Sequence, residues 1–440
     1  MNLFYNNLLE NLLLPVGDAI LGTTYIKELK RWRQIQKMDE QQLKQLSSAK
    51  LNSVLKHAVE NIPAYAFLKN KPELKISDFP ITHKADIKRN IDNFMWHPEK
   101  KNNLILEKSS GSSGIQGEIY MNKQEQSKII ALQTLLWEWA GYQIGYPMLQ
   151  TGMTTNRGFV KSVKDFLFRV DYNSAFGLNE KVVLDVLQNF KRKKRNFFGG
   201  YASSLNIFAI TAKKYNLNQI QFDAVISWGD KLFDHYRKAI EETFQTKVYD
   251  TYGTTEGFVI GGQKDLPFLY ILTPMVHVEI VDKHGNEVRD GELGYVVVTH
   301  LDAFEMPLIR YYLGDLAIKM PKDEYPLQKE LAFPLFKKII GRDTDMVVTP
   351  GGRYMIVHSF TVIFEHCKEI KQFRVIQNQK ESITIEYIPD EGFNTVILDS
   401  LRKKIIDQLG EEIIIHFEEK EIIPPTPSGK PQIVISQIKY

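Results

Sequence analysis

The sequence has little cysteine: Cys367 is the single one among 440 residues, so no disulfide can form within the chain. Its neighbours are typical of an ordinary helix rather than of a nucleophile's pocket. This scarcity indicates a reducing, cytoplasmic setting. The ten histidines form no H-E-x-x-H pattern, and paired cysteines are absent, which argues against a zinc site.

The sequence also lacks a large excess of charge of either sign. A net charge of +3 is too small to indicate a nucleic-acid partner. Hydrophobic residues at 43% and charged residues at 25% are typical of a soluble globular protein. The basic run at residues 191–195 follows an expected helix, and we interpret it as a solvated helix end. A chain of this length is expected to fold as two or more domains.

Long apolar runs are missing too. Residues 3–21 are rich in leucine, but asparagine and acidic residues interrupt them and Pro15 splits them. We therefore expect neither a transmembrane segment nor a signal peptide here. The spacing predicts a short amphipathic helix docked on the body of the protein, with a peripheral membrane contact as the alternative.

The most informative segment that is present covers residues 108–120, a run of serine and glycine. Its serines offer hydroxyl donors, and its glycines let backbone N–H groups approach phosphate oxygens. It is not a Walker A loop, a dinucleotide fingerprint or a nucleophile elbow, because the spacing of each is absent. Taken alone, the run could equally be a flexible linker.

Apolar spacing from about residue 25 to residue 66 predicts helix, ending at the sequence Asn-Ile-Pro of residues 61–63. Further helices are expected near residues 128–139, 180–191, 203–215 and 234–244, with strands at 224–228 and 247–250. This alternation predicts a layered α/β structure.

From about residue 275 the pattern becomes β-rich. Strands are expected at residues 276–281, 294–299 and 315–319, with a turn at 283–286. Beyond residue 341 strand and helix segments return over a length that suits a small domain. We predict an N-terminal domain over residues 1–340 that includes a β-rich subdomain at about 275–340, a hinge at 341–345, and an α+β C-terminal domain at 346–440.

Five later segments suit ATP chemistry on a carboxylate. Residues 248–257 place an aromatic ring, hydroxyls and a carboxylate at a strand end, where α/β ligand crevices form. Residues 226–232 are a second strand that ends in glycine, and residues 307–315 end in a carboxylate suited to ribose hydroxyls. Residues 341–346 add a guanidinium, and residues 424–431 present a single lysine on a loop. Each segment alone is weak evidence for such chemistry, but the order of all five along the chain is specific.

In this order of motifs the chain resembles the adenylate-forming superfamily of acyl-CoA synthetases. Tyr-Gly-Thr-Thr-Glu, Arg-Tyr-Tyr-Leu-Gly-Asp and Thr-Pro-Ser-Gly-Lys follow the phosphate loop as they do in that superfamily. Pro-Ala-Tyr at residues 63–65, Gly-Tyr-Ala-Ser-Ser-Leu at 200–205 and Met-Pro-Leu-Ile-Arg at 306–310 are similar to the phenylacetate-CoA ligase branch, in particular its CapK-like capsule-biosynthesis members.

The resemblance implies a two-step reaction. A carboxylate attacks the α-phosphorus of ATP to give an acyl adenylate and pyrophosphate, and a thiol or amine then displaces AMP. Attack on phosphorus builds negative charge, so catalysis depends mostly on positioning and electrostatics. Magnesium would bridge phosphate oxygens, and coenzyme A is the expected acceptor.

The resemblance also implies a set of site residues, each carried over to its position in this sequence. Lys430, Thr255 and Arg342 would be catalytic, with Lys430 bridging the carboxylate and the α-phosphate. Glu256 would bind Mg²⁺, Tyr252 would cover the adenine, and Asp315 would hold the ribose. The remaining ATP contacts would be Ser109, Ser110, Gly111, Ser112, Ser113, Gly114, Gly229, Asp230, Gly253 and Thr254.

The C-terminal domain of such enzymes rotates between the two half-reactions, and the resemblance places the pivot at Asp343 or Thr344. Gly351 and Gly352 would then face the acceptor. Thr344 stands where many relatives carry Asp, and Asp230 replaces a more usual Glu. Ile-Gln-Gly at residues 115–117 also gives the phosphate loop less positive charge than in many relatives.

Tyr201 and Trp228 could line an acyl pocket, although aromatic residues at strand ends more often belong to the core. The carboxylic acid itself stays open. Three functions remain: an acyl-CoA ligase, an enzyme that transfers the acyl group to an amine or hydroxyl of a surface-polysaccharide precursor, and a non-catalytic nucleotide-binding relative. Retention of Lys430 and Glu256 argues against the third.

Overall fold

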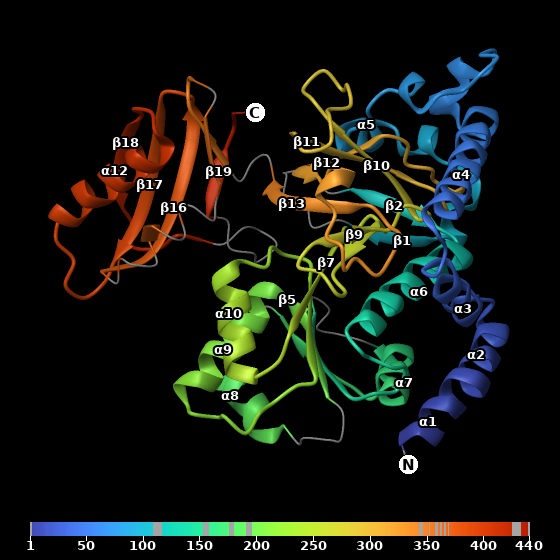
Figure 1. The fold of residues 1–440 in the computed structure, drawn as a ribbon, viewed down its shortest axis with the longest axis horizontal. Coiled ribbons are helices and arrows are strands. Elements are labelled where there is room, and N and C mark those ends of the chain that lie inside the picture. The colour runs from blue at the N-terminus through green and yellow to red at the C-terminus, as the bar shows by residue number, and fades with distance from the viewer. Residues whose placement is uncertain are drawn as a thin grey trace.

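The computed structural model describes most of the chain: residues 2–108, 117–152, 158–175, 180–190, 196–342, 346–351, 353–356, 360, 363–364, 367, 369–424 and 433–438. Figure 1 shows a large N-terminal region and a smaller C-terminal lobe beside it. The predicted fold class, a layered α/β domain with a smaller C-terminal domain, is confirmed.

The helices lie mostly in the N-terminal region. The α-helices are α1 (Asn2–Leu8), α2 (Leu14–Leu21), α3 (Tyr25–Ile35), α4 (Glu40–Asn61), α5 (Lys84–Arg89), α6 (Lys123–Trp139), α7 (Gly158–Phe168), α8 (Glu180–Asn189), α9 (Ala202–Lys214), α10 (Asp234–Phe244) and α12 (Val396–Leu409). A π-helical turn, η1 (Leu9–Leu13), joins α1 to α2. Short 3₁₀ turns are η2 (Pro63–Leu68), η3 (Ile76–Asp78), η4 (Ile91–Phe94), η5 (Pro98–Asn103) and η6 (Lys322–Glu324).

One sheet of 11 strands runs through the N-terminal region in the order β10-β11-β12-β13-β9-β8-β7-β6-β5-β3-β4. Its strands are β3 (Met148–Gly152), β4 (Val170–Ser174), β5 (Phe197–Tyr201), β6 (Ala224–Trp228), β7 (Val248–Gly253), β8 (Val259–Gly262), β9 (Leu269–Ile271), β10 (Val276–Val281), β11 (Leu293–His300), β12 (Tyr311–Lys319) and β13 (Leu335–Arg342). A separate hairpin pairs β1 (Ile105–Lys108) with β2 (Glu118–Met121).

The two halves of this sheet differ in direction. From β4 to β7 neighbouring strands are parallel, and from β7 to β10 they are antiparallel. Helices α8, α9 and α10 bury one face of the parallel half around Phe198, Phe208 and Phe244. On the other face the aromatic residues at the end of α6 pack against β3, β5 and β6. Parallel strands need such cover on both faces because their side chains are apolar on both.

The C-terminal lobe has its own sheet and core. Strands β16 (Ile370–Gln379), β17 (Ser382–Pro389), β18 (Ile414–Glu419) and β19 (Val434–Ser436) form a sheet in the order β18-β17-β16-β19, on which α12 packs. A two-stranded hairpin, β14 (Met346–Val348) and β15 (Tyr354–Ile356), precedes it. The predicted hinge residues 343–345 lie outside the described residues, so the boundary stays a prediction.

Two apolar contacts join the lobe to the N-terminal region. Val348 and Ile438 of the lobe pack with Ile340 and its neighbours on β10 to β13. Phe233, in the loop after β6, packs against the core of the lobe. Beside it the ammonium group of Lys231 donates to the carbonyl oxygen of Ile340, near the end of β13. The loop after β6 therefore contacts both the lobe and the strand that leads to it.

Several elements agree closely with the sequence. Helix α10 and strand β10 have the predicted limits, and α4 ends at Asn61 as expected. The prediction of one long helix from residue 25 is wrong in one respect. It is interrupted between Ile35 and Glu40, because the carboxylate of Asp39 accepts from the backbone N–H of Gln42 and caps a new helix.

Pro15 divides the leucine-rich stretch in sequence but does not end its helical segment. Helices α1 and α2 continue into each other through the π-helical turn η1, in which the N–H of Leu14 donates to the carbonyl of Leu9. Pro15 stands in the first turn of α2, directly after this π-helical turn. In the described residues no helix is both long and apolar enough to cross a bilayer.

Candidate functional site

Strand β7 begins the predicted nucleotide motif of residues 248–257, which we call the central motif. It lies where the strand pairing changes from parallel to antiparallel. Its first residues pair with β6 in parallel, and Thr251, Tyr252 and Gly253 pair with β8 in antiparallel fashion. The chain turns tightly after it, with the N–H of Thr254 donating to the carbonyl of Phe258 at 2.8 Å. A side chain at Gly253 would meet that carbonyl, so this approach requires glycine. The carboxyl end of a parallel strand beside such a change is where α/β folds form ligand crevices.

Tyr252 and Asp315 come together although they lie on strands that are not neighbours in the sheet. The hydroxyl of Tyr252 donates to Oδ2 of Asp315 at 2.6 Å. The ring of Tyr252 also packs edge-on against Phe336, with ring centres 5.9 Å apart. Asp315 faces Arg342 in the register between β12 and β13. The three residues predicted to contact adenine, ribose and phosphate, namely Tyr252, Asp315 and Arg342, thus lie together. For Arg342 this statement concerns the backbone only.

Gly229 and Asp230 follow directly on the end of β6. Gly229 has a φ of 80° and leaves room for the ring of Tyr201, which a Cβ atom at this position would strike. The carboxylate of Asp230 accepts from the backbone N–H of Ser203 at 3.2 Å. Burial, with the nearby charge of Asp230, raises the pKa of the Tyr201 hydroxyl to about 12. Tyr201 is therefore neutral at physiological pH.

Tyr201 and Trp228 are direct neighbours across β5 and β6. The indole of Trp228 stacks on that of Trp137, with centres 5.9 Å apart and an angle of 26° between the planes. A side chain at Gly199 would strike the Trp228 ring, so glycine makes room for it. These two aromatic residues end their strands at the same edge of the sheet as Gly229. Their predicted role in an acyl pocket stays a prediction.

Glu256 is buried, with 7% of its surface exposed. Its Oε1 lies 2.9 Å from the ammonium group of Lys84 and accepts from the hydroxyl of Tyr311 at 3.4 Å. Burial opposes ionisation of this carboxyl, yet the adjacent Lys84 holds its pKa below the ordinary value. Glu256 is therefore an ionised, buried carboxylate at neutral pH.

This carboxylate fits the predicted magnesium role in its donor chemistry. In nucleotide sites Mg²⁺ takes one or two carboxylates and completes its shell with phosphate and water oxygens. Glu256 is one such carboxylate, and the hydroxyl of Thr255 lies 3.4 Å from its Oε2. Among the described residues no group of three or more His, Cys, Asp or Glu side chains could hold a metal by itself.

Other predicted site residues lie outside the described residues: Ser109, Ser110, Gly111, Ser112, Ser113, Gly114, Asp343, Thr344, Gly352 and Lys430. Gly351 is described, and its N–H donates to Oε1 of Glu411 at 2.8 Å. The same carboxylate accepts from the hydroxyl of Thr349. Glu411 thus holds the loop predicted to face the acceptor.

Lys84 and Tyr311 are contacts of Glu256 that sequence reasoning missed. Lys84 starts the short helix α5, far from Glu256 in the chain, so no spacing pattern links the two. The segment before it is fixed to the sheet, since the N–H of Thr82 donates to the carbonyl of Arg310 at 2.9 Å. A lysine that opens a helix, where the dipole disfavours a cation, was the one signal available.

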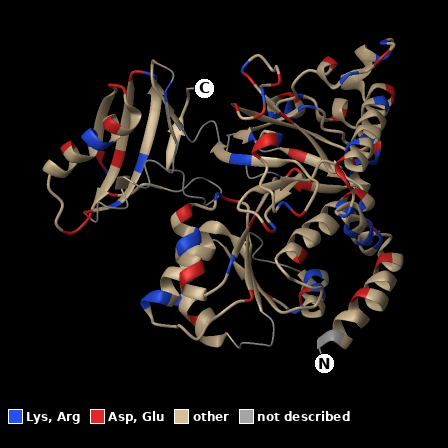
Figure 2. Ribbon diagram, viewed as in Figure 1, with Lys and Arg blue, Asp and Glu red and all other residues tan. Residues whose placement is uncertain are grey.

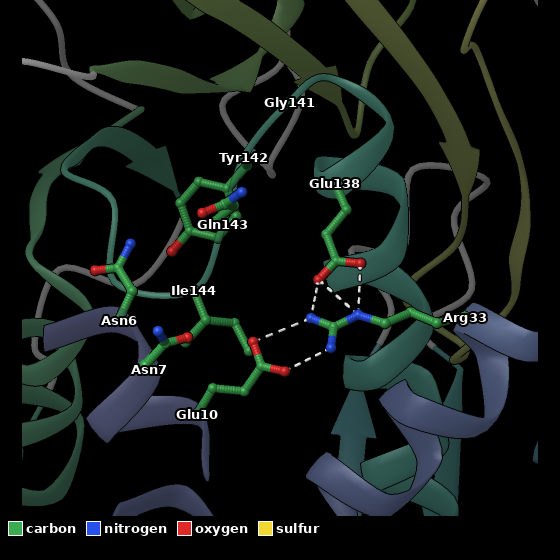
Figure 3. A pocket seen from close by; sticks show the side chains of 9 residues that line it. All are labelled: Asn6, Asn7, Glu10, Arg33, Glu138, Gly141, Tyr142, Gln143 and Ile144. Atoms are coloured by element: carbon green, nitrogen blue, oxygen red, sulfur yellow. Dashed lines mark hydrogen bonds and ion pairs between the residues drawn. The ribbon is translucent and has the colours of Figure 1, made fainter. Parts of the chain in front are cut away.

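A polar cavity of about 410 Å³ lies away from these residues, under the N-terminal helices. Figure 3 shows Arg33 between the carboxylates of Glu10 and Glu138. The cavity is lined by Asn6, Asn7, Glu10, Arg33, Glu138, Gly141, Tyr142, Gln143 and Ile144. None of the predicted nucleotide residues belongs to it.

Comparison with solved structures defines the class of this fold. The chain is similar to 2-hydroxyisobutyryl-CoA ligase in its postadenylation state, with a TM-score of 0.68 over 90% of this chain and 89% of the other at 17% identity. The TM-score is 0.54 for the same ligase in its thioesterification state, again over 90% of this chain. The fold is that of the adenylate-forming ligases.

Relatives in sequence narrow this similarity further. The chain is 24% identical to protein CapK of Staphylococcus aureus over 100% of both chains. It is 23% identical to phenylacetate-coenzyme A ligase of Pseudomonas putida over 86% of this chain and 90% of the other. The family model described as the CapK C-terminal domain matches residues 347–437. The resemblance to the phenylacetate-CoA ligase and CapK branch of the adenylate-forming ligases is confirmed.

Proposed function

We propose that this chain activates a carboxylic acid with ATP and transfers the acyl group to coenzyme A. In the first step a carboxylate oxygen bonds to the α-phosphorus, and pyrophosphate leaves with the electron pair of the broken P–O bond. In the second step the thiol sulfur bonds to the acyl carbon, AMP leaves, and the thiol proton is released. This is the chemistry that the relatives' names, as CoA ligases, and the shared fold support.

The observation that carries the proposal is the pairing of Tyr252 with Asp315. A tyrosine ring offers a flat face for a purine, and a carboxylate accepts from both hydroxyls of a ribose. The hydrogen bond between them fixes the ring and the carboxylate in one relative orientation before any nucleotide binds. Such preorganisation lowers the ordering cost of binding.

The other described residues extend this site toward the phosphates. Gly229 and Asp230 lie at the carboxyl end of β6, the strand beside β7, and would form the edge of the purine pocket. Thr255 would contact the α-phosphate, and Glu256 would hold Mg²⁺, which when bound neutralises charge on the phosphate oxygens. Lys430 would bring one positive charge to the bond being formed, as the resemblance implies.

A second candidate keeps the same activation and changes the acceptor to an amine or hydroxyl of a surface-polysaccharide precursor. The observation that favours it is the match of residues 347–437 to the CapK C-terminal domain, together with the full-length similarity to CapK. In both candidates ATP and a small carboxylic acid are consumed in the same first step, for which Mg²⁺ would be required.

The deciding experiment measures pyrophosphate release from ATP with a panel of carboxylic acids, with and without coenzyme A. Turnover that requires coenzyme A, with an acyl-CoA as the product, supports the first candidate. Adenylate formation that coenzyme A leaves unchanged supports the second. Absence of any pyrophosphate release across the panel, in a protein that still binds ATP, would instead identify a non-catalytic nucleotide-binding relative.

A further inference from the structure

The N-terminal arm, which we define as α1, η1 and α2, exposes an unusual amount of apolar surface. Six large apolar side chains of the arm are each between 40% and 78% exposed: Phe4, Leu12, Leu13, Val16, Ile20 and Leu21. Scattered exposed apolar residues are normal, but six on one helical segment form a patch. In water this patch raises the free energy of the folded protein.

The arm turns its charged side chains toward the protein instead. Glu10 accepts from Arg33 at 3.1 Å, and Figure 3 shows the same guanidinium bound to Glu138 of α6. Asp18 accepts from the backbone N–H of Ile26 at 2.8 Å. Asn6 is 93% buried, with 7% of its surface exposed. An ordinary surface helix has the opposite orientation, with its charges in water and its apolar stripe inward.

Helix α7 extends the patch. The hydroxyl of Tyr5 in α1 donates to the carbonyl of Leu167 in α7 at 2.7 Å, which fixes the two helices side by side. Figure 1 shows α7 next to α1. Phe166 is 81% exposed and Val163 is 42% exposed on this helix. Exposed apolar side chains therefore also occur on a helix that adjoins the arm.

Among the described residues of the arm and α7, the exposed charged side chains are those of Lys161 and Lys164, while the carboxylate of Asp165 in α7 is half-buried. Every exposed residue between positions 4 and 21 is uncharged, because the two acidic residues of that range face inward. Lysines stand at the border: Lys123, which donates to the carbonyl of Leu21 at 2.8 Å, and the exposed Lys27, Lys161 and Lys164. Figure 2 shows the arm largely without blue, and blue segments on α7.

We propose that the arm and α7 together form a docking surface for the interfacial region of an anionic lipid bilayer. The apolar side chains enter the headgroup boundary, and the bordering lysines contact lipid phosphates, as in amphipathic helices that lie in a membrane surface. A second copy of this chain fits less well, since two such surfaces would meet with lysines at both borders and with no exposed carboxylate of the arm to balance them. The docking would place the enzyme beside acceptors or products that are held in the membrane.

The test measures co-sedimentation of the full chain with phosphatidylcholine vesicles that contain or lack phosphatidylglycerol. We expect binding to the anionic vesicles that weakens as salt is added. Leu12→Glu, Val16→Glu and Ile20→Glu combined should lower that binding by about tenfold or more, because each change puts a charge into the interface. Lys161→Gln with Lys164→Gln should lower it by about fivefold for each lysine removed.

The matched control places three glutamates at exposed apolar positions elsewhere, as Leu327→Glu, Val396→Glu and Ile422→Glu. It changes the net charge equally and should retain far more binding than the arm variant. Equal loss in both variants would overturn the proposal. So would a wild-type chain that ignores vesicles at low salt, or an arm variant whose main effect in light scattering is to break a dimer. If the arm variant fails to fold, the lysine pair and the salt dependence decide the question.

Discussion

The ammonium group of Lys84 lies 2.9 Å from the carboxylate of Glu256 and is its nearest charged partner. Glu256 is almost fully buried, so the pair is poorly screened and the carboxylate depends on the lysine for its charge. The structure thereby links the first turn of α5 to the motif after β7. The predictions below begin with this pair.

Replacement of Lys84 by Met should destabilise the protein by about 3 kcal/mol, because it leaves a buried carboxylate without its cation. It should also lower kcat/KM for pyrophosphate release by about tenfold or more, since the carboxylate is no longer held in place. Urea unfolding and a pyrophosphate assay measure the two effects. Lys88→Met, on the exposed side of the same helix, is the control.

The double variant Lys84→Met with Glu256→Gln separates structure from catalysis. It should regain much of the lost stability, because no unpaired charge stays buried, and it should remain inactive. Recovery of activity in the double variant would show that Glu256 serves only to neutralise Lys84.

Asp315→Ala should weaken ATP binding by about 2 kcal/mol, and Tyr252→Phe should weaken it by about 1 kcal/mol, as expected for a charged and a neutral hydrogen-bond partner. Calorimetric titration with a non-hydrolysable ATP analogue, without any carboxylic acid, measures both. Asp323→Asn, an exposed acidic residue in η6, serves as the control. Unchanged affinity in Asp315→Ala would contradict a ribose contact at this position.

Lys430→Ala should separate the two half-reactions. Adenylate formation should fall by about a hundredfold or more, since one charge at the reacting phosphorus is lost, while acyl transfer from a supplied acyl adenylate should stay close to wild type. Rapid-quench measurements of each step check this. Lys403→Ala on α12 is the matched change in the same lobe. Equal loss in both half-reactions would contradict this division of roles.

Asp250 lies in β7, next to the predicted site, and its burial raises the pKa of its carboxyl to about 7. Between about pH 4 and pH 7 the unfolded chain ionises this group while the folded chain keeps its proton, so stability falls as pH rises and levels off above 7. Asp250→Asn should remove that slope, which corresponds to a difference on the order of 4 kcal/mol between the ends of the range. Urea unfolding of both proteins at a series of pH values measures it.

The histidines do not confuse this comparison. Burial lowers the pKa of both His277 and His300 to about 4, which makes stability fall as the pH drops from about 6.5 to 4. That slope has the opposite sign and is common to both proteins. An Asp250→Asn variant with the same pH profile as the wild type would show that the carboxyl titrates normally.

The sequence allowed the prediction of those parts of the fold that depend on near neighbours. Helix α10 and strand β10 follow local apolar spacing. Helix α6 was predicted only from residue 128, although its capping box between Asn122 and Glu125 starts it at Lys123. The residues from Tyr252 to Glu256 were predicted at a strand end, and they lie there. Such features need only propensities and motifs that span a few residues.

The parts that were missed depend on contacts between distant segments. No pattern in the chain shows that Lys84 meets Glu256, or that β7 joins a parallel half and an antiparallel half into one sheet. The arm is a similar case, because its apolar spacing predicts a buried stripe while the ion pair of Glu10 with Arg33 fixes the opposite side inward. Periodicity shows that a helix has two faces, and it does not show which one the protein covers.

The contact of Phe233 with the C-terminal lobe should depend on temperature. Its ring comes from the loop that follows Gly229 and packs, half-buried, against the core of the C-terminal lobe, so a lobe that moved away from this loop would expose more of the ring to water. Apolar contacts of this kind weaken on cooling. Cooling should therefore weaken the contact between this loop and the C-terminal lobe.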